Sequence, residues 1–120
     1  MNNIASPKVL LRVEGATMLA MSVGLYAYVS GNWLLFALLL LAPDLSALGY
    51  LAGARVGSIT YNLAHIYLFP AALAAYGLLA PNSLALSLSL IWFAHIGMDR
   101  TVGYGLKYPT AFKDTHLSRV

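Results

Sequence analysis

The sequence contains no cysteine and little charge. The absence of cysteine excludes disulfide bonds, thiolate metal ligands and cysteine nucleophiles, which leaves histidine and carboxylate chemistry. Only 9% of the 120 residues are charged and 60% are hydrophobic. A soluble domain of this size could not bury so much apolar surface. The composition therefore predicts an integral membrane protein whose main partner is the lipid bilayer.

Positive charge is present but is not concentrated. The formal net charge of +3 comes from seven Lys and Arg residues spread along the chain. Nucleic-acid-binding proteins gather such residues into a basic patch or stripe. Nucleic acid is therefore not an expected partner, and the basic residues are better interpreted as markers of membrane topology.

Turn residues divide the chain into four apolar segments, each about long enough to cross a bilayer. The expected spans are residues 9–30, 33–52, 57–79 and 84–103, followed by a polar tail, 104–120. Short turns between neighbours predict an all-α, polytopic four-helix up-down bundle that forms a single domain over residues 1–120. Pro43 and Pro70 are expected to kink the second and third spans.

The basic residues predict the orientation of these spans. Every Lys and Arg falls on one side of the membrane: Lys8, Arg12, Arg55, Arg100, Lys107, Lys113 and Arg119. The two turns on the other side carry no charge. The positive-inside rule then predicts a multi-pass protein of the plasma membrane with both termini in the cytosol.

Ionisable side chains within the spans lie at one predicted depth. Counting about 1.5 Å per residue from the span ends places six polar groups in the inner leaflet. They are Glu14, Asp44, Asn62, His65, His95 and Asp99. One ionised side chain in hydrocarbon costs about 3 kcal/mol, so such groups should face one another inside the bundle.

One interpretation of this layer is a metal site. Asp44, His65, His95 and Asp99 offer carboxylate and imidazole ligands that suit a single divalent ion such as Zn, Mn or Fe. His95 and Asp99 are one turn apart on the same helix face, and ligands from facing helices commonly build metal centres in bundles. Asn62 lies three residues before His65 and supports the same face.

The corresponding function is hydrolysis at the cytosolic leaflet. A metal-bound water, with its pKa lowered towards neutrality, would attack an ester, amide or phosphoester of a lipid-like substrate. Glu14 and His116 are the candidate general bases.

Three other interpretations remain open. The network of carboxylates and histidines could serve only to fix helix register. His65 and His95 could be axial ligands of a haem. Alternatively, the protein is a non-enzymatic, proton-coupled carrier or a binding protein for a small or lipophilic ligand, with Glu14 or Asp44 as the essential membrane carboxylate.

The polar tail begins where this layer meets the cytosol. Gly103 and Gly105 permit a sharp turn, so the tail can fold back over the site. Asp114 and His116 would then supply further ligands or an acid/base pair, and Arg100 or Lys107 would hold an anion. A solvated basic tail is the equally simple alternative.

Several short strings carry a resemblance over nearly the whole chain. The chain resembles the small bacterial membrane family known as domain of unknown function 4260 in five strings: 42–46 (Ala-Pro-Asp-Leu-Ser), 61–65 (Tyr-Asn-Leu-Ala-His), 95–100 (His-Ile-Gly-Met-Asp-Arg), 103–109 (Gly-Tyr-Gly-Leu-Lys-Tyr-Pro) and 112–117 (Phe-Lys-Asp-Thr-His-Leu). The resemblance implies a four-span protein of the bacterial inner membrane and carries no established activity.

A looser similarity relates the chain to membrane-bound metal-dependent hydrolases. It matches four positions to that group's Pro-Asp pair, histidine-bearing helix and His-x-x-x-Asp helix: Asp44, His65, His95 and Asp99. Ser46 stands where a second aspartate is usual, and the His-Arg and Thr-His pairs are reduced to Asn62 and His65. The similarity therefore implies one metal ion rather than two.

Overall fold

The computed structural model describes residues 6–110 and 113–119, and within these ranges it is helical, with no named strand. The predicted all-α class is thus confirmed. In chain order the elements are α1 (Pro7–Val29), α2 (Trp33–Leu39), the 3₁₀ helix η1 (Ala42–Ala52), α3 (Ala54–Ala64), α4 (Leu68–Leu79), α5 (Ser83–Val102) and the short α6 (His116–Arg119).

Two of the predicted spans are broken near their middle. The second is divided into α2 and η1, and the third into α3 and α4. Pro43 lies at the start of η1 and Pro70 in the first turn of α4. A proline has no N–H, and its ring clashes with the carbonyl four residues earlier. Each of the two prolines therefore favours a break in the helix just before it. Both breaks lie beside predicted metal ligands.

Among the residues that the structure describes, three helical segments are long and apolar enough to cross a membrane: Pro7–Val29, Trp33–Ala52 and Ala54–Leu79. Large apolar side chains cover their outer faces; Leu38, Leu48 and Leu51 are 70%, 63% and 90% exposed. Such faces suit a lipid environment better than water. The fourth predicted span, α5, is not among these three, and it carries Asp99 and Arg100 near its end.

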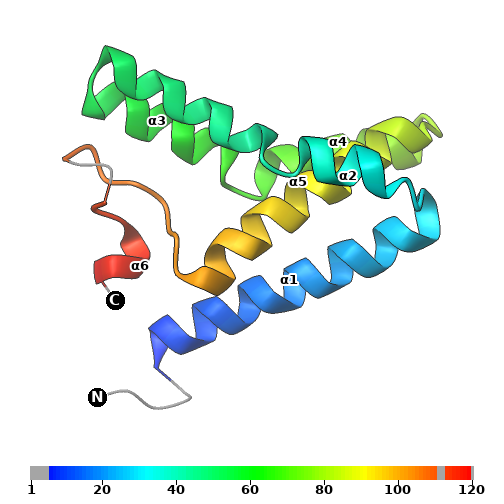
Figure 1. Ribbon diagram of the computed structural model, residues 1–120, viewed down its shortest axis with the longest axis horizontal. Helices are drawn as coiled ribbons and strands as arrows, with labels where there is room; N and C mark the ends of the chain where they lie inside the picture. The colour runs from blue at the N-terminus through cyan, green and yellow to red at the C-terminus, as the bar shows by residue number, and fades with distance from the viewer. Residues whose placement is uncertain (1–5, 111–112, 120) are drawn as a thin grey trace.

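Helix α5 is the centre of the fold, and α1 lies along one side of it (Figure 1). The two helices meet at Gly15 and Gly97. A Cβ atom at Gly15 would lie 2.3 Å from the Cβ of Arg100, and one at Gly97 would lie 2.7 Å from the backbone nitrogen of Leu19. The two backbones therefore touch, as small residues allow in membrane bundles.

The fold has two arms: the α1–α5 pair forms the first, and the η1–α3 pair forms the second. η1 packs against α3, and this pair diverges from the α1–α5 pair towards one end of the molecule, where the tail and α6 also lie (Figure 1). α4, which follows α3 in the chain, packs against α5. The C-terminal half of α5 carries His95 and Asp99, and both contact Asp44 of η1 or His65 at the end of α3.

Candidate metal centre

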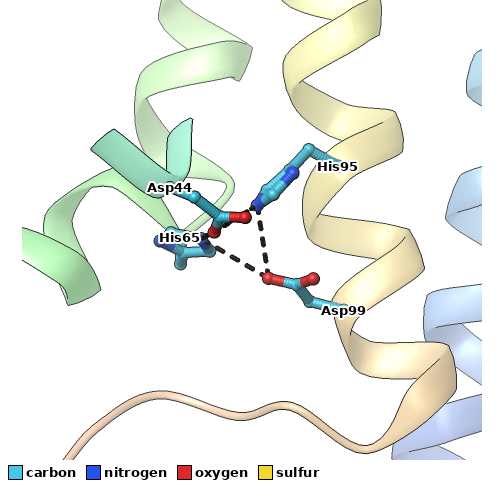
Figure 2. A group of neighbouring side chains, drawn as sticks. All are labelled: Asp44, His65, His95 and Asp99. Atoms are coloured by element: carbon cyan, nitrogen blue, oxygen red, sulfur yellow. Dashed lines mark hydrogen bonds and ion pairs between the residues drawn. The ribbon is translucent and has the colours of Figure 1, made fainter. Parts of the chain in front are cut away.

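Four ionisable side chains meet where the two arms join (Figure 2). Asp44 comes from η1, His65 from the end of α3, and His95 and Asp99 from consecutive turns of α5. One ligand atom of each residue lies within 4.8 Å of the others. These are the four residues that the sequence analysis selected as metal ligands, and they form a group able to hold a metal ion.

Each histidine nitrogen lies close enough to the other three ligand atoms to share one metal ion with them. Nε2 of His65 lies 3.0 Å from Nε2 of His95, 3.2 Å from Oδ1 of Asp44 and 3.4 Å from Oδ2 of Asp99. Nε2 of His95 lies 3.1 Å from the Asp44 oxygen and 3.3 Å from the Asp99 oxygen. Metal bonds of about 2.0–2.1 Å in a tetrahedron require ligand separations of about 3.3–3.4 Å.

Backbone contacts fix the tautomer of both histidines. Nδ1 of His65 lies 2.7 Å from the carbonyl oxygen of Tyr61, and Nδ1 of His95 lies 2.7 Å from that of Leu40. A carbonyl oxygen can only accept, so each Nδ1 carries the hydrogen and donates it. In a neutral ring each Nε2 is then an unprotonated acceptor. Two nitrogen lone pairs and two carboxylates therefore point at one another, an arrangement that a cation would stabilise.

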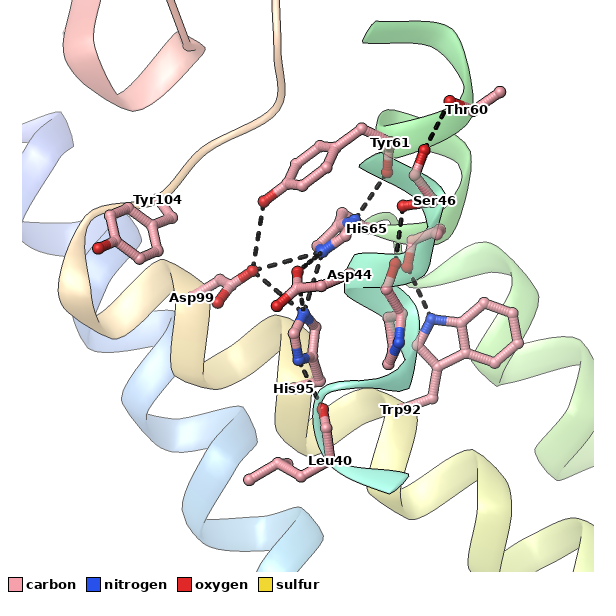
Figure 3. A network of polar contacts seen from close by, with 12 residues as sticks. Leu40, Asp44, Ser46, Thr60, Tyr61, His65, Trp92, His95, Asp99 and Tyr104 are labelled. Carbon is pink, nitrogen blue, oxygen red and sulfur yellow. Dashed lines mark hydrogen bonds and ion pairs between the residues drawn. The ribbon is translucent and has the colours of Figure 1, made fainter. Parts of the chain in front are cut away.

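The helix breaks supply the carbonyls that orient these rings. The N–H of Asp44 donates to Leu41 and not to Leu40, and the N–H of His65 donates to Asn62 and not to Tyr61. The carbonyls of Leu40 and Tyr61 instead face Nδ1 of His95 and His65 and accept from these rings (Figure 3). Irregular backbone at membrane depth is tolerated where protein groups satisfy it in this way.

The centre is buried on one side and open on the other. Both histidine side chains are 0% exposed and Asp99 is 7% exposed, whereas Asp44 is 46% exposed. Asp44 and Asp99 line a cavity of about 680 Å³. Small molecules can thus approach the centre on the Asp44 side. Tyr61 forms part of the wall: its ring stacks on His65 and its hydroxyl donates to Asp99 over 3.4 Å.

Arg100 contacts the backbone next to the centre and not the ligand atoms. Its Nη2 donates to the carbonyl of His65 at 2.8 Å, and its Nη1 donates to the carbonyl of Tyr104 at 3.0 Å. The side chain is buried. The guanidinium therefore fixes the backbone at the break after α3 and at the start of the tail, and the predicted anion-binding role stays a prediction.

The tail folds back over the open side, as the glycines predicted. Gly103 caps α5 with a φ of 98°, a left-handed conformation that glycine adopts easily. Asn62 then holds the tail: its Nδ2 donates to the carbonyl of Lys107 at 2.7 Å, and its Oδ1 accepts from the Lys107 N–H at 2.6 Å. Lys107 is buried, which lowers the pKa of its ammonium group. Asn62 is therefore a supporting residue of the tail and not a ligand.

His116 does not lie in the cavity as a base. Its Nδ1 accepts the N–H of Leu106 at 2.8 Å, and its own N–H donates to the Leu106 carbonyl at 2.9 Å. Burial, followed by the nearby charge of Arg100, lowers the pKa of the ring. Both the ring and the backbone of His116 therefore close the tail, and its predicted role as a base stays a prediction.

Asp114 also turns away from the centre. Its carboxylate binds Arg119, with contacts of 2.8 and 2.6 Å, and accepts from the hydroxyl of Thr110. Hydrogen bonds from Arg119 and Thr110 lower the pKa of Asp114 to about 2. Asp114 stabilises the end of the tail and adds no ligand.

Glu14 is exposed and lines a different cavity, of about 540 Å³, together with Arg100 and Tyr67. The expected convergence of Glu14 with the four ligands is not found. The reason is the packing of α1, which touches α5 at Gly97. Gly97 is about 200° around the helix from His95, so α1 covers the opposite face of α5.

Tyr61 and Trp92 were not predicted to take part in the site. Tyr61 lies four residues before His65, a spacing that places both on one face and that could have identified the stacked pair. Trp92 donates from Nε1 to the carbonyl of Ala64 at 2.7 Å, beside the break after α3. No signal in the sequence locates that carbonyl, because it becomes available only through the break.

Comparison with known proteins gives one result. Neither the curated proteins nor the solved structures contain a match to this chain. The family model of a domain of unknown function, DUF4260, matches residues 8–120. This match covers nearly all of the sequence and confirms the resemblance identified from the five strings; the chain is a member of the DUF4260 family.

Proposed function

We propose that this protein is a membrane-bound, metal-dependent hydrolase with one divalent ion at Asp44, His65, His95 and Asp99. The observation that carries the proposal is the convergence of acceptors. Two Nε2 atoms lie 3.0 Å apart, and backbone carbonyls take the only hydrogens that the neutral rings carry. A divalent ion would be held by these four residues in place of their mutual repulsion, and the exposed side of Asp44 would leave room for a water beside it.

The donor set limits the choice of ion. Two imidazole nitrogens and two carboxylate oxygens, without a thiolate, suit Zn, Mn or Fe. A haem fits less well. Its two axial nitrogens lie on opposite sides of the iron, about 4 Å apart, with a flat macrocycle between them. The two Nε2 atoms here lie closer, at 3.0 Å, with both carboxylates beside them.

The proposed topology has four spans in the bacterial inner membrane, with both termini in the cytosol. Three segments have the length and hydropathy to cross, and α5 is the fourth. α5 contains 20 residues, and its charged end is shielded because Asp99 and Arg100 are buried against other parts of the chain. This placement puts the cavity near the cytosolic leaflet, with the basic residues on the same side.

Asp44 has the position needed for both coordination and proton transfer. Its Oδ1 faces both histidines, whereas its side chain remains 46% exposed and lines the cavity. We assign its second oxygen as the proton acceptor, in place of Glu14 and His116. The two buried histidines and Asp99 hold the ion on the closed side, and water enters from the cavity.

A divalent ion at this site would lower the pKa of a bound water towards about 7 and polarise the scissile group. In the proposed hydrolysis, the water oxygen bonds to the carbonyl carbon or phosphorus of the substrate. The bond to the leaving alcohol oxygen or amine nitrogen breaks. Asp44 takes the proton that the water loses, and that proton passes to the leaving group. The reaction needs no oxidant or reductant.

Hydrolysis is tested with the purified full-length protein in detergent. The metal-free protein and the protein loaded with Zn or Mn are each given p-nitrophenyl acetate and bis(p-nitrophenyl) phosphate. Release of p-nitrophenol by the loaded wild type should exceed release by the metal-free protein and by His95→Gln loaded in the same way, and His116→Gln should retain activity. Equal release by loaded wild type and loaded His95→Gln would contradict the proposal.

A further inference from the structure

Groups of both charges line the cavity beside the centre. Asp44 and Asp99 belong to the centre, and the tail contributes Lys107 and Lys113. The hydroxyl-bearing Thr115 and Ser118 also line the tail side. Both lysines reach one cavity because the tail turns back on itself, with an antiparallel bridge between Lys107 and Thr115.

Metal binding would change the net charge of this cavity. Without an ion, two carboxylates balance two ammonium groups. A divalent ion cancels the carboxylates and leaves the lysines, a net charge of about +2 in a partly enclosed space. The loaded cavity should therefore attract an anion, and the empty one should not.

The position of Lys107 is fixed. Both polar atoms of the Asn62 amide hold its backbone. Its ammonium nitrogen lies 4.8 Å from the centre of the Tyr61 ring, and that ring stacks on His65 at 3.8 Å between centroids. A buried ammonium over the ring that covers a metal ligand is a pre-organised cationic contact beside the centre. Lys113 is exposed and adds a second, more adaptable cation.

We propose that this cavity binds the phosphate group of a phosphoester, with Lys107 and Lys113 neutralising the oxygens that do not face the metal. The inference rests on the metal centre proposed above and names its substrate class. A phosphate dianion matches the net charge of the loaded cavity, and its several oxygens can engage a metal ion and two cations together.

The remaining wall of the cavity is apolar or aromatic. It includes Ala47, Tyr61 and Tyr104. This wall would contact the organic part of the ester. A lipid headgroup and a soluble phosphoester share the phosphate chemistry, so both sources belong in the test.

The test uses full-length protein loaded with Mn²⁺, with inorganic phosphate as the first probe. A phosphate bound near Mn²⁺ relaxes its ³¹P nucleus strongly, and the concentration dependence of the line width gives a dissociation constant. Lys107→Met should weaken phosphate binding about tenfold, as expected for losing one charge-assisted contact, and Lys113→Gln should weaken it less. Lys8→Gln, on α1 and outside the cavity, should leave binding unchanged.

Bound manganese is measured by mass spectrometry in every sample, which separates the two proposals. A wild type without stoichiometric manganese would overturn the metal centre itself. Stoichiometric manganese with no phosphate-dependent relaxation, or with equal affinity in Lys107→Met, Lys113→Gln and Lys8→Gln, would overturn the phosphate inference alone. Because Lys113 is exposed, Lys113→Gln keeps the test valid if Lys107→Met does not fold.

A second arm identifies the source of the phosphate. Vesicles of phosphatidylcholine with phosphatidic acid are compared with a short-chain soluble phosphate monoester under the same conditions. Tighter binding of phosphatidic acid supports a lipid headgroup, and tighter binding of the soluble ester supports a soluble substrate. Absence of lysine-dependent binding in both would overturn the inference.

Discussion

Nε2 of His65 and Nε2 of His95 lie 3.0 Å apart, although the Nδ1 hydrogens of both rings are donated to backbone carbonyls. Two neutral imidazoles cannot make a hydrogen bond in this arrangement, because neither Nε2 has a hydrogen to donate. A shared cation resolves the conflict. The carboxylates of Asp44 and Asp99 would supply the other two protein ligands, and the cavity beside Asp44 would admit a water.

The two carboxylates should differ in importance. Asp99 is 7% exposed and accepts from the hydroxyl of Tyr61, whereas Asp44 is 46% exposed. In Asp44→Ala, water can enter from the cavity and occupy the vacant position, so metal affinity should fall by about tenfold to a hundredfold. Asp99→Ala leaves a buried gap and should reduce affinity further. Equal losses, measured by competition with a fluorescent chelator, would contradict this ordering.

Metal should stabilise the fold. An ion that binds only the folded state at a concentration of 100 times its dissociation constant adds about 2.7 kcal/mol to the free energy of unfolding. Thermal unfolding in detergent should therefore move to higher temperature when Zn or Mn is added to metal-free wild type. His65→Gln should show no such shift. A shift of equal size in His65→Gln would place the stabilising ion elsewhere.

The glycines between α1 and α5 should be intolerant of side chains. A Cβ at Gly15 would lie 2.3 Å from the Cβ of Arg100 and 2.9 Å from the carbonyl oxygen of Gly97, whereas nothing lies within 4 Å of a Cβ at Gly24. Gly15→Ala should destabilise the fold by about 1–3 kcal/mol through overpacking. Gly24→Ala, on the same helix, should be neutral or stabilising by up to about 1 kcal/mol. Unfolding in detergent compares the two, and equal effects would contradict the close packing of α1 and α5.

The end of the tail should depend on pH. The pKa of Asp114 is lowered from 3.8 to about 2, chiefly by the hydrogen bond from Arg119. A lowered pKa means that the interaction stabilises the tail above about pH 4 and is lost as the pH falls towards 2. Arg119→Gln should raise the pKa of Asp114 towards its ordinary value in a carboxyl NMR titration. An unchanged titration would show that Arg119 is not its main partner.

Much of the centre could be predicted because depth in a membrane follows from counting residues. The four ligands have the right height on their helices, and the spacing of His95 and Asp99 places both on one face. Height does not determine which neighbour a helix face meets. Glu14 has a suitable depth, but α1 packs against the Gly97 side of α5, away from the ligands.

The breaks could be predicted only in part. Pro43 and Pro70 indicate where a helix is weakened, and the structure interrupts both helices just before them. Which side chains donate to the carbonyls at these breaks depends on long-range packing. Leu40 and His95 are 55 residues apart, and their contact has no local signature in the sequence. The same holds for Asn62 and Lys107, whose paired hydrogen bonds become possible only after Gly103 has turned the tail back.

Metal content is the most direct test of the centre formed by Asp44, His65, His95 and Asp99. The purified full-length wild type, His65→Gln, His95→Gln and His116→Gln are each equilibrated with Zn or Mn, freed of unbound ion and measured by mass spectrometry. The account predicts one ion per chain in the wild type and in His116→Gln, and a loss in His65→Gln and His95→Gln. A wild type without bound metal, or equal metal content in all four proteins, would contradict it.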